Sequence, residues 1–275
     1  MMNLAPNATD AVREIFADQE RCGHMCFNHR KAVLFSKYTP AYIVSNENVH
    51  DVVQRFMPKQ THNALTVAAS GDHPLICKLY GAKNVKTFDI SYNAKVLMDI
   101  KSAAVPILNI GEYSNLLENL YKKPRLLSVP QMDKIMPRLT PVVRQYIRDT
   151  NGVRLFSKGF GPQSYMRYAL MPTEYKTLQS KLTKSFDFTW SDITDLNLYE
   201  MYDFMHLSNV MDYVQYDDLA PILKKMQKHV NIGGRIVIDS LVDRYTRIWL
   251  MDAVSKQNDW NIYTYSHVSV LERIR

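Results

Sequence analysis

Two acidic residues, each placed at the end of a short apolar segment, are the features of this sequence best suited to chemistry. The segment ALTVAASGD ends in Ser70, Gly71 and Asp72, and the segment KTFDI carries Asp89 17 positions after Asp72. A glycine lets the backbone approach a ligand closely because it has no Cβ. A carboxylate about 20 residues further on is well placed to accept hydrogen bonds from two ribose hydroxyls. The spacing therefore predicts a nucleoside-binding site.

The loop after the first of these segments differs from the loops that bind dinucleotides. It holds one glycine and a carboxylate, whereas a pyrophosphate is bound by the bare amides of several glycines and is repelled by a nearby acid. A ligand with a cationic amino-acid end would instead be attracted to Asp72. This favours S-adenosylmethionine as the cofactor. The alternative for each acid is structural, with Asp72 capping a helix in a tight turn and Asp89 capping the helix that begins near Tyr92.

Polar residues also follow two later segments that have the pattern of strands. FTWSDI would bring an acid to the adenine amino group and an apolar side chain over the ring, and FMHLSNVMDY would bring Asp212 and Tyr213 to the reacting centre. We expect these two residues to be catalytic, because they could orient or deprotonate an acceptor. His206 lies inside the strand pattern and is expected in the core. The other predicted cofactor-binding residues are Ala69, Ile90, Asp192, Ile193, Ser208 and Asn209.

The elements that must position these residues alternate between strands and helices. The continuous apolar run at 64–69 predicts a buried parallel strand, and NVKTFDI at 84–90 predicts a second strand. Each is followed by a helical pattern, at 73–82 and 91–108. The alternation returns after 185, with a turn at NIGG before the last parallel strand, and the chain ends in a predicted antiparallel pair. We therefore predict an α/β Rossmann-like fold of the class I methyltransferase type, with a mostly parallel sheet and a C-terminal antiparallel hairpin. Its expected parts are a helical cap over 1–60 and a cofactor-binding domain over 61–275, with a helical insertion at about 104–185.

Three segments carry a resemblance to a known family. The segment from LTVAASGDHPL through KTFDISYNAKVLMDIKSAAVPIL, with YIVSNENVHDVV before it and LSNVMDYV after it, resembles the family related to the S-adenosylmethionine:diacylglycerol 3-amino-3-carboxypropyl transferases of betaine-lipid synthesis. The likeness covers roughly residues 40–110 and 186–240, while the chain is shorter than the lipid enzymes and LSNVMDYV follows their pattern only loosely. The resemblance implies that the glycine loop and Asp89 hold the cofactor. It also implies that Asn46, Glu47 and Asn48 approach the cofactor from the amino-terminal cap.

The predicted activity is transfer of a group from S-adenosylmethionine by displacement at the sulfonium. All three carbons bonded to the sulfur are electrophilic, so the carbon held in line with the acceptor is the one transferred. The resemblance favours the 3-amino-3-carboxypropyl group, which leaves methylthioadenosine. Methyl transfer, which leaves S-adenosylhomocysteine, is the alternative, and a non-catalytic cofactor-binding subunit is a third.

Composition sets the remaining expectations. The chain has 275 residues, a formal net charge of +7 and only 3 cysteines, which suits a basic, solvated surface and a cytoplasmic, reducing location. Peripheral contact with anionic surfaces fits this charge, and a small-molecule or lipid acceptor is favoured over nucleic acid. No membrane-spanning segment is expected. We expect packing for Tyr165, Arg167, Tyr168 and Tyr175, and buried thiols in place of a metal site for the cluster Cys22, His24, Cys26 and His29.

Overall fold

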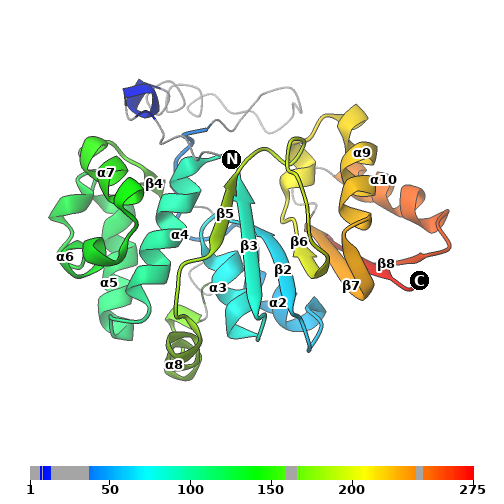
Figure 1. Ribbon diagram of the computed structural model, residues 1–275, viewed down its shortest axis with the longest axis horizontal. Coiled ribbons are helices and arrows are strands. Elements are labelled where there is room, and N and C mark those ends of the chain that lie inside the picture. Colours follow the sequence, from blue (N-terminus) through cyan, green and yellow to red (C-terminus); the bar gives the residue numbers. More distant parts are fainter. Residues whose placement is uncertain (1–6, 8, 14–36, 159–165, 167, 240–243) are drawn as a thin grey trace.

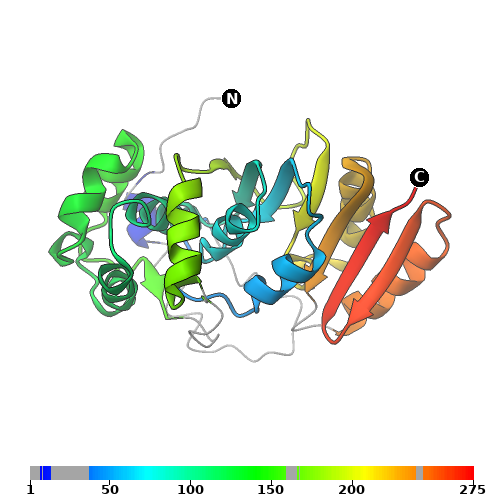
Figure 2. The same cartoon turned by 90° about the horizontal axis from the view of Figure 1, so that it is seen from below.

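The centre of the protein is a seven-stranded sheet, shown by a computed structural model that describes residues 7, 9–13, 37–158, 166, 168–239 and 244–275. The strand order is β5-β3-β2-β6-β7-β9-β8, and the first five strands are parallel (Figure 1). Strands β9 and β8 complete the sheet as an antiparallel hairpin at one edge (Figure 2). The strands are β2 (Asn63–Val67), β3 (Asn84–Asp89), β5 (Asp187–Trp190), β6 (Tyr202–His206), β7 (Val230–Asp239), β8 (Trp260–Tyr265) and β9 (Val268–Arg273).

The direction in which the strands are added reverses between β2 and β6. The chain proceeds outward from β2 to β3 and β5, and then returns to the other side of β2 to add β6 and β7. At such a reversal the connections leave the carboxyl ends of the two central strands in opposite directions, which opens a crevice for a ligand. This order, with the antiparallel hairpin at its end, confirms the predicted class I methyltransferase fold.

The central strand β2 is covered on both faces, which explains its run of buried side chains. Along β2, Leu65 and Val67 belong to one buried cluster and Ala64 to the other. One cluster packs against α9 (Tyr216–Gln227) and α10 (Arg244–Ser255), and the opposite cluster packs against α3 and α4 (Figure 1). Apolar and polar residues do not alternate along a strand that is buried on both faces, because neither face meets water.

The helices of the second face include most of the predicted insertion. Between α4 and β5 the chain forms a helical layer, and within it the two-residue strand β4 (Phe156–Ser157) pairs in parallel with β1 (Ala41–Tyr42) from the amino-terminal region. This pairing joins the insertion to the segment that precedes α2. The helices on this side are α2 (Val49–Phe56), α3 (Asp72–Leu79), α4 (Tyr92–Ala104), α5 (Ile110–Lys122), α6 (Met132–Ile135), α7 (Pro141–Asp149) and α8 (Pro172–Lys181).

Local sequence signals account for where several of these helices begin. Asn109 and Glu112 form a reciprocal capping box at the start of α5, with bonds of 2.9 and 3.0 Å between each side chain and the other residue's amide. Thr140 caps α7 directly before Pro141, whose missing amide proton costs nothing in the first turn.

Two local predictions differ from the structure. The residues NIGG were expected to form a turn, but they lie inside β7, where the register against β6 is irregular and Gly233 has a φ of 77°. A bulge of this kind accepts glycine in a left-handed conformation within a strand. Helix α10 was not predicted.

No helix among the described residues combines the length and apolar character needed to cross a bilayer.

Gly71 carries a prediction about stability. Its φ is 79°, and a Cβ built there would lie 3.0 Å from the Met98 Cα and 3.3 Å from the Lys101 Cδ. We expect Gly71→Ala to lower the free energy of unfolding by more than the roughly 1–3 kcal/mol of the backbone strain alone, because α4 must also move. The matched control is Gly233→Ala, with a φ of 77° and nothing within 4 Å of the added carbon. Equal losses in urea unfolding of the two variants would contradict the close approach of the loop to α4.

Candidate functional site

A pocket of about 390 Å³ lies at the carboxyl ends of the central parallel strands, where the strand order reverses. Segments far apart in the sequence form its wall: the chain before α2, the loops after β2, β3 and β5, and the segment after β6. The structure brings together around this pocket the predicted residues Asn46, Glu47, Ala69, Ser70, Asp89, Ile90, Asp192, Ile193, Ser208, Asn209 and Tyr213.

Asp89, at the end of β3, is held in place before any ligand arrives. Its Oδ2 accepts a hydrogen bond of 2.8 Å from the Ala69 amide, and its Oδ1 accepts one of 2.8 Å from the Ser91 amide. Burial raises the pKa of this carboxyl to about 6, although the backbone hydrogen bonds act in the opposite direction. Since each carboxylate oxygen can accept a second bond, Asp89 can still receive two hydroxyls from the pocket.

The Asp89 carboxylate also stabilises a strained residue in the neighbouring loop. Ala69 has a φ of 45°, a left-handed conformation that is costly for a residue with a Cβ. Its amide bond to Asp89 and the 2.7 Å bond from the Gly71 amide to the Ala68 carbonyl fix this turn. The loop after β2 is therefore bonded directly to Asp89 at the end of β3, and Ala69 and Asp89 both line the pocket.

Asp72 has a different environment from the one predicted for a direct ligand contact. The residue is buried and does not line the pocket; its Oδ1 accepts bonds from the Lys101 Nζ at 2.6 Å and the Tyr168 hydroxyl at 2.7 Å. Its Oδ2 accepts a 2.7 Å bond from the Ser70 hydroxyl. Asp72 thus supports the loop from behind through Ser70, which does line the pocket.

Lys101 is the buried cation that balances Asp72. Its side chain has no exposed surface, and its ammonium also donates to the Ile43 carbonyl at 2.8 Å. Burial lowers the pKa of Lys101, while the charge of Asp72 raises it. The Asp72 carboxylate and the Lys101 ammonium depend on each other, because removal of either one leaves the other as an uncompensated charge in the interior.

Glu47 forms a second buried polar centre on the opposite wall. Its Oε2 lies 3.2 Å from the His73 Nε2, and its Oε1 accepts bonds from the Ser208 hydroxyl and, at 3.2 Å, from the Asn209 amide. Burial by itself would raise the pKa of this carboxyl, but its hydrogen bond to His73 and the charges of His73 and His206 bring the pKa below its ordinary value. Glu47 therefore connects the segment before α2 to the start of α3 and to the residues that follow β6.

Of the residues at the end of β6 and directly after it, some line the pocket and others do not. Ser208 has a φ of 55°, and the Asn209 side chain donates to the Tyr213 hydroxyl at 3.5 Å. Burial, with a smaller contribution from Asp212, raises the pKa of Tyr213 to about 12, so Tyr213 keeps its proton at neutral pH. Asp212, Gly71 and the core residue His206 are buried outside the pocket lining, and the half-buried Asn48, which caps α2, does not line it either.

Some pocket residues had no signal in the sequence. Thr39, Pro40, Ala41 and Tyr42 line the pocket because β1 brings them there, and a two-residue strand has too little pattern to be predicted. His73 directly follows Asp72, and only the proximity of both to the loop could have drawn attention to it. Tyr168 and Tyr175 are buried, as expected for packing. Cys22, His24, Cys26, His29, Tyr165 and Arg167 lie outside the described residues.

Comparisons with known proteins found similarity only among solved structures. No family model matches the chain, and no curated protein matches it. A ribosomal protein methylase from Lactobacillus delbrueckii subsp. bulgaricus is similar with 10% identity, 83% coverage of this chain, 77% of that chain and a TM-score of 0.43. The N-methyltransferase NodS from Bradyrhizobium japonicum WM9, in complex with S-adenosyl-l-homocysteine, has 10% identity, 98% and 100% coverage and a TM-score of 0.40. An S-adenosylmethionine-dependent methyltransferase from Clostridium acetobutylicum ATCC 824 has 12% identity, 94% and 66% coverage and a TM-score of 0.37.

The buried ion pair between Asp72 and Lys101 leads to a prediction about stability. We expect Lys101→Met to lower the free energy of unfolding by about 3–5 kcal/mol, because the Asp72 carboxylate loses its charged partner. The double variant with Asp72→Asn should lose less than the sum of the two single variants, since it removes both charges together. Urea unfolding of the four proteins measures this coupling. Lys256→Met, in an exposed pair with Asp252, should leave the midpoint unchanged, and strict additivity in the Asp72 and Lys101 cycle would contradict the pairing.

Proposed function

We propose that this chain is an S-adenosylmethionine-dependent transferase. The observation that carries the proposal is the charge of the pocket. Four carboxylates line it, from Glu47, Asp89, Asp192 and Asp218, and none of the described residues in its lining is a lysine or an arginine. A chain with a net charge of +7 has therefore placed an acidic wall at the switch point of its sheet, where open α/β folds bind their ligands.

The acidic wall distinguishes between classes of nucleoside ligand. A dinucleotide or a nucleoside phosphate would bring negative phosphates into a pocket whose described lining is acidic and holds no basic side chain. Like charges in a confined site repel each other strongly. S-adenosylmethionine instead carries a sulfonium and an ammonium with one carboxylate. The donor set of the pocket fits this cofactor, and it does not fit a phosphorylated one.

Individual residues can be assigned to parts of the cofactor. Asp89 is proposed to accept the ribose hydroxyls, because both of its oxygens are oriented by backbone amides and retain accepting capacity. Asp192 and Ile193 are proposed to contact the adenine, with Ile193 almost fully buried beside the pocket. Ser70 and Ala69 present the β2–α3 loop to the same crevice. Asn46, Ser208 and Asn209 line the remaining wall, towards the amino-acid end.

The bound cofactor supplies an electrophilic carbon on a sulfonium. An acceptor's lone pair would displace the sulfonium at that carbon, the electron pair of the broken carbon–sulfur bond would return to sulfur, and the proton that the acceptor loses would pass to water. Tyr213, which stays protonated at neutral pH, is assigned to orient the acceptor by hydrogen bonding. The resemblance to the betaine-lipid enzymes favours transfer of the 3-amino-3-carboxypropyl group, with methyl transfer as the alternative.

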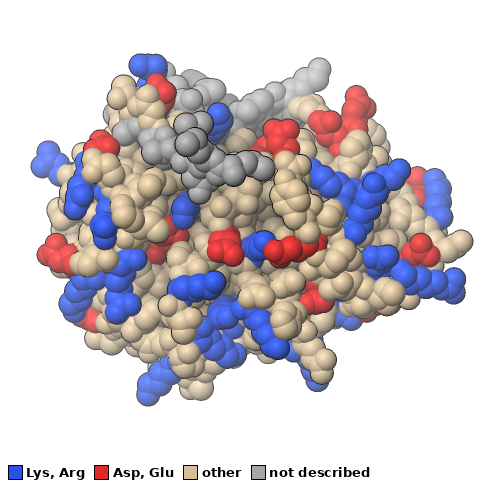
Figure 3. All heavy atoms as spheres, in the orientation of Figure 1, with Lys and Arg blue, Asp and Glu red and all other residues tan. Residues whose placement is uncertain are grey.

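The acceptor is proposed to be a small molecule or a lipid. Among the residues that the structure describes, the pocket lining offers no basic side chain for a phosphodiester backbone, and such contacts provide most of the affinity for nucleic acid. On the face shown in Figure 3 basic and acidic side chains are interspersed. Contact with an anionic surface would therefore be peripheral.

The reaction products test the proposal. The full chain would be incubated with S-adenosylmethionine and a panel of acceptors, including amines and vesicles that contain diacylglycerol, and the nucleoside products separated by chromatography. Methylthioadenosine identifies aminocarboxypropyl transfer, and S-adenosylhomocysteine identifies methyl transfer. Binding of S-adenosylhomocysteine in calorimetry with neither product would identify a cofactor-binding protein without this activity. If the chain bound neither S-adenosylmethionine nor S-adenosylhomocysteine, the proposal would be overturned.

Asp89 gives a prediction with a pH dependence. Because its pKa is about 6 in the free protein, the carboxylate is present above pH 7 and is lost as the pH falls below 6. Affinity for S-adenosylhomocysteine should therefore be constant at higher pH and weaken about tenfold for each pH unit below 6. Asp89→Asn should bind roughly 10–100-fold more weakly at pH 7.5, since hydrogen bonds to a charged group contribute about 1.5–3 kcal/mol, and should show a flatter pH profile.

The control for this measurement is Asp187→Asn, which changes an exposed carboxyl at the opposite end of the adjacent strand β5. Calorimetric titrations of the three proteins at several pH values provide the comparison. An unchanged affinity in Asp89→Asn would exclude the assigned contact with the ribose.

A further inference from the structure

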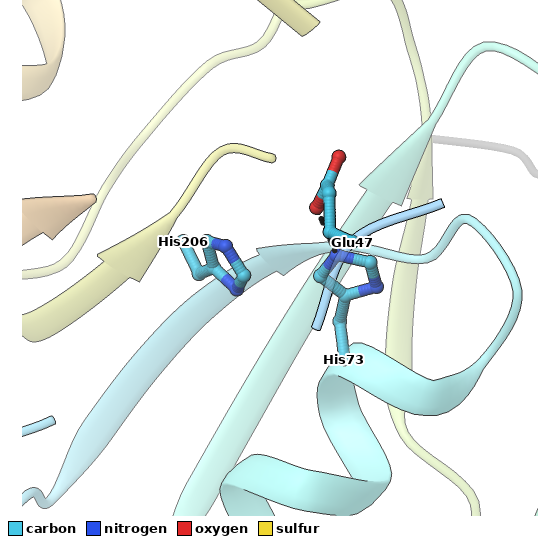
Figure 4. Close-up of side chains that lie close together, drawn as sticks. All are labelled: Glu47, His73 and His206. Atoms are coloured by element: carbon cyan, nitrogen blue, oxygen red, sulfur yellow. Dashed lines mark hydrogen bonds and ion pairs between the residues drawn. The ribbon is translucent and has the colours of Figure 1, made fainter. Parts of the chain in front are cut away.

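Two buried histidines and a buried glutamate converge beside the proposed cofactor pocket. Glu47 comes from the segment before α2, His73 from the first turn of α3 and His206 from the end of β6, and their side chains point toward one another (Figure 4). One carboxylate oxygen and one ring nitrogen from each histidine lie within 4.8 Å of one another. The exposed fractions of these residues are 3%, 0% and 0%.

The hydrogen bonds of the two rings leave part of their capacity unused. The His206 Nε2 lies 3.0 Å from the Asp239 Oδ2, and the His73 Nε2 lies 3.2 Å from the Glu47 Oε2. Among the described residues, neither His73 Nδ1 nor His206 Nδ1 has a hydrogen-bond partner, and both are buried. In a neutral His206, donation from Nε2 to Asp239 leaves a lone pair on Nδ1. In His73 the nitrogen that faces Glu47 is Nε2, so an ion would take the place of the proton between this nitrogen and the carboxylate.

The surroundings of His206 resemble those of histidines that bind metals. A histidine that binds a metal usually donates its second ring N–H to a carboxylate, which fixes the tautomer and the orientation of the ring. Asp239 is fully buried and occupies this position. His206 is thus oriented by a residue on the neighbouring strand β7, and its other nitrogen is available.

The charges of the cluster also suit a cation. Glu47 and Asp239 are both buried acids, and the cationic side chains that act on them among the described residues are histidines: His73, His206 and the partly exposed His267. The rings of His73 and His206 lie only 4.9 Å apart, so two imidazolium ions there would repel each other. A divalent ion would balance the two carboxylates while both rings stay neutral.

We propose that Glu47, His73 and His206 bind one divalent first-row transition-metal ion, with Asp239 as the residue that orients His206. Two imidazoles and one carboxylate suit zinc, iron(II), manganese, cobalt or nickel, whereas magnesium and calcium select oxygen ligands. Bonds of about 2.0–2.2 Å place ligand atoms roughly 3–3.6 Å apart. The ligand atoms of the cluster lie within 4.8 Å of one another, so binding needs only a small movement of these side chains. Glu47 would keep its Oε1 bonds to Ser208 and Asn209, which connects the ion to the pocket wall.

Metal content of the full chain tests this site without reference to catalysis. The protein would be stripped with a chelator, reconstituted separately with zinc, iron(II) under anaerobic conditions, manganese, cobalt and nickel, desalted and analysed by mass spectrometry of the elements. We expect about one ion per chain for at least one of these metals. Cobalt should add visible absorption bands typical of nitrogen and oxygen ligands.

Variants locate the bound ion. His73→Asn and His206→Asn should lose at least tenfold in metal affinity, and Asp239→Asn should lose about 10–100-fold, as expected for a residue that supports a ligand. The matched control is His50→Asn, because His50 is also buried, at 1% exposure, and contacts Tyr80 and Glu174 instead. A variant with Cys22→Ser and Cys26→Ser tests the cysteine cluster as another source of bound metal. Circular dichroism melts confirm that each variant is folded.

Two outcomes would overturn the proposal. One is a chain that takes up none of the five metals above the level of a protein blank. The other is metal that persists in folded His73→Asn and His206→Asn but disappears when Cys22 and Cys26 are replaced. Neither result bears on S-adenosylhomocysteine binding, so this site and the proposed function can fail separately.

Discussion

The buried ion pair between Asp72 and Lys101 is the interaction on which the arrangement of the site depends. Asp72 is bonded to Ser70 in its own loop, to Lys101 on α4 and to Tyr168 in the insertion, and Lys101 donates to the Ile43 carbonyl in the amino-terminal region. Four segments therefore meet at one pair of opposite charges. Because neither charge can remain buried alone, these segments must assemble together, and the loop that faces the pocket takes its shape from contacts made behind it.

The pocket and the rest of the molecule have opposite charge character, and this contrast limits the ligand more than the fold does. Rossmann-like sheets with this strand reversal accommodate many ligands, so the topology alone leaves the chemistry open. The acidic lining, with no basic side chain among its described residues, favours the proposed sulfonium cofactor over a phosphate-rich one on electrostatic grounds. Asp89 adds a geometric requirement, because its two oxygens are fixed by backbone amides from different loops.

Much of the sheet could be predicted from sequence, whereas the partners of the site residues could not. The apolar run at 64–69 predicted the strand now found at 63–67, and the predicted second strand at 84–90 is found at 84–89. The carboxyl ends of neighbouring parallel strands must meet, which placed Asp89 beside the glycine loop. The contact between Asp72 and Lys101 spans 29 positions, and Glu47 reaches Ser208 across 161. No local pattern encodes such pairings. The NIGG segment shows the opposite difficulty, since two glycines have the pattern of a turn while the sheet uses them within an irregular strand.

The short pairing of β1 with β4 has a consequence for how specificity evolves in this fold. Ala41 and Tyr42 belong both to the pocket wall and to a strand whose partner is Phe156–Ser157, deep in the inserted helical layer. Substitutions in that layer can shift the wall through the backbone, even though they touch no bound molecule. Under the proposed function, divergent copies of this chain could therefore acquire new acceptors by remodelling a remote module, while the residues proposed to hold the nucleoside are inherited intact.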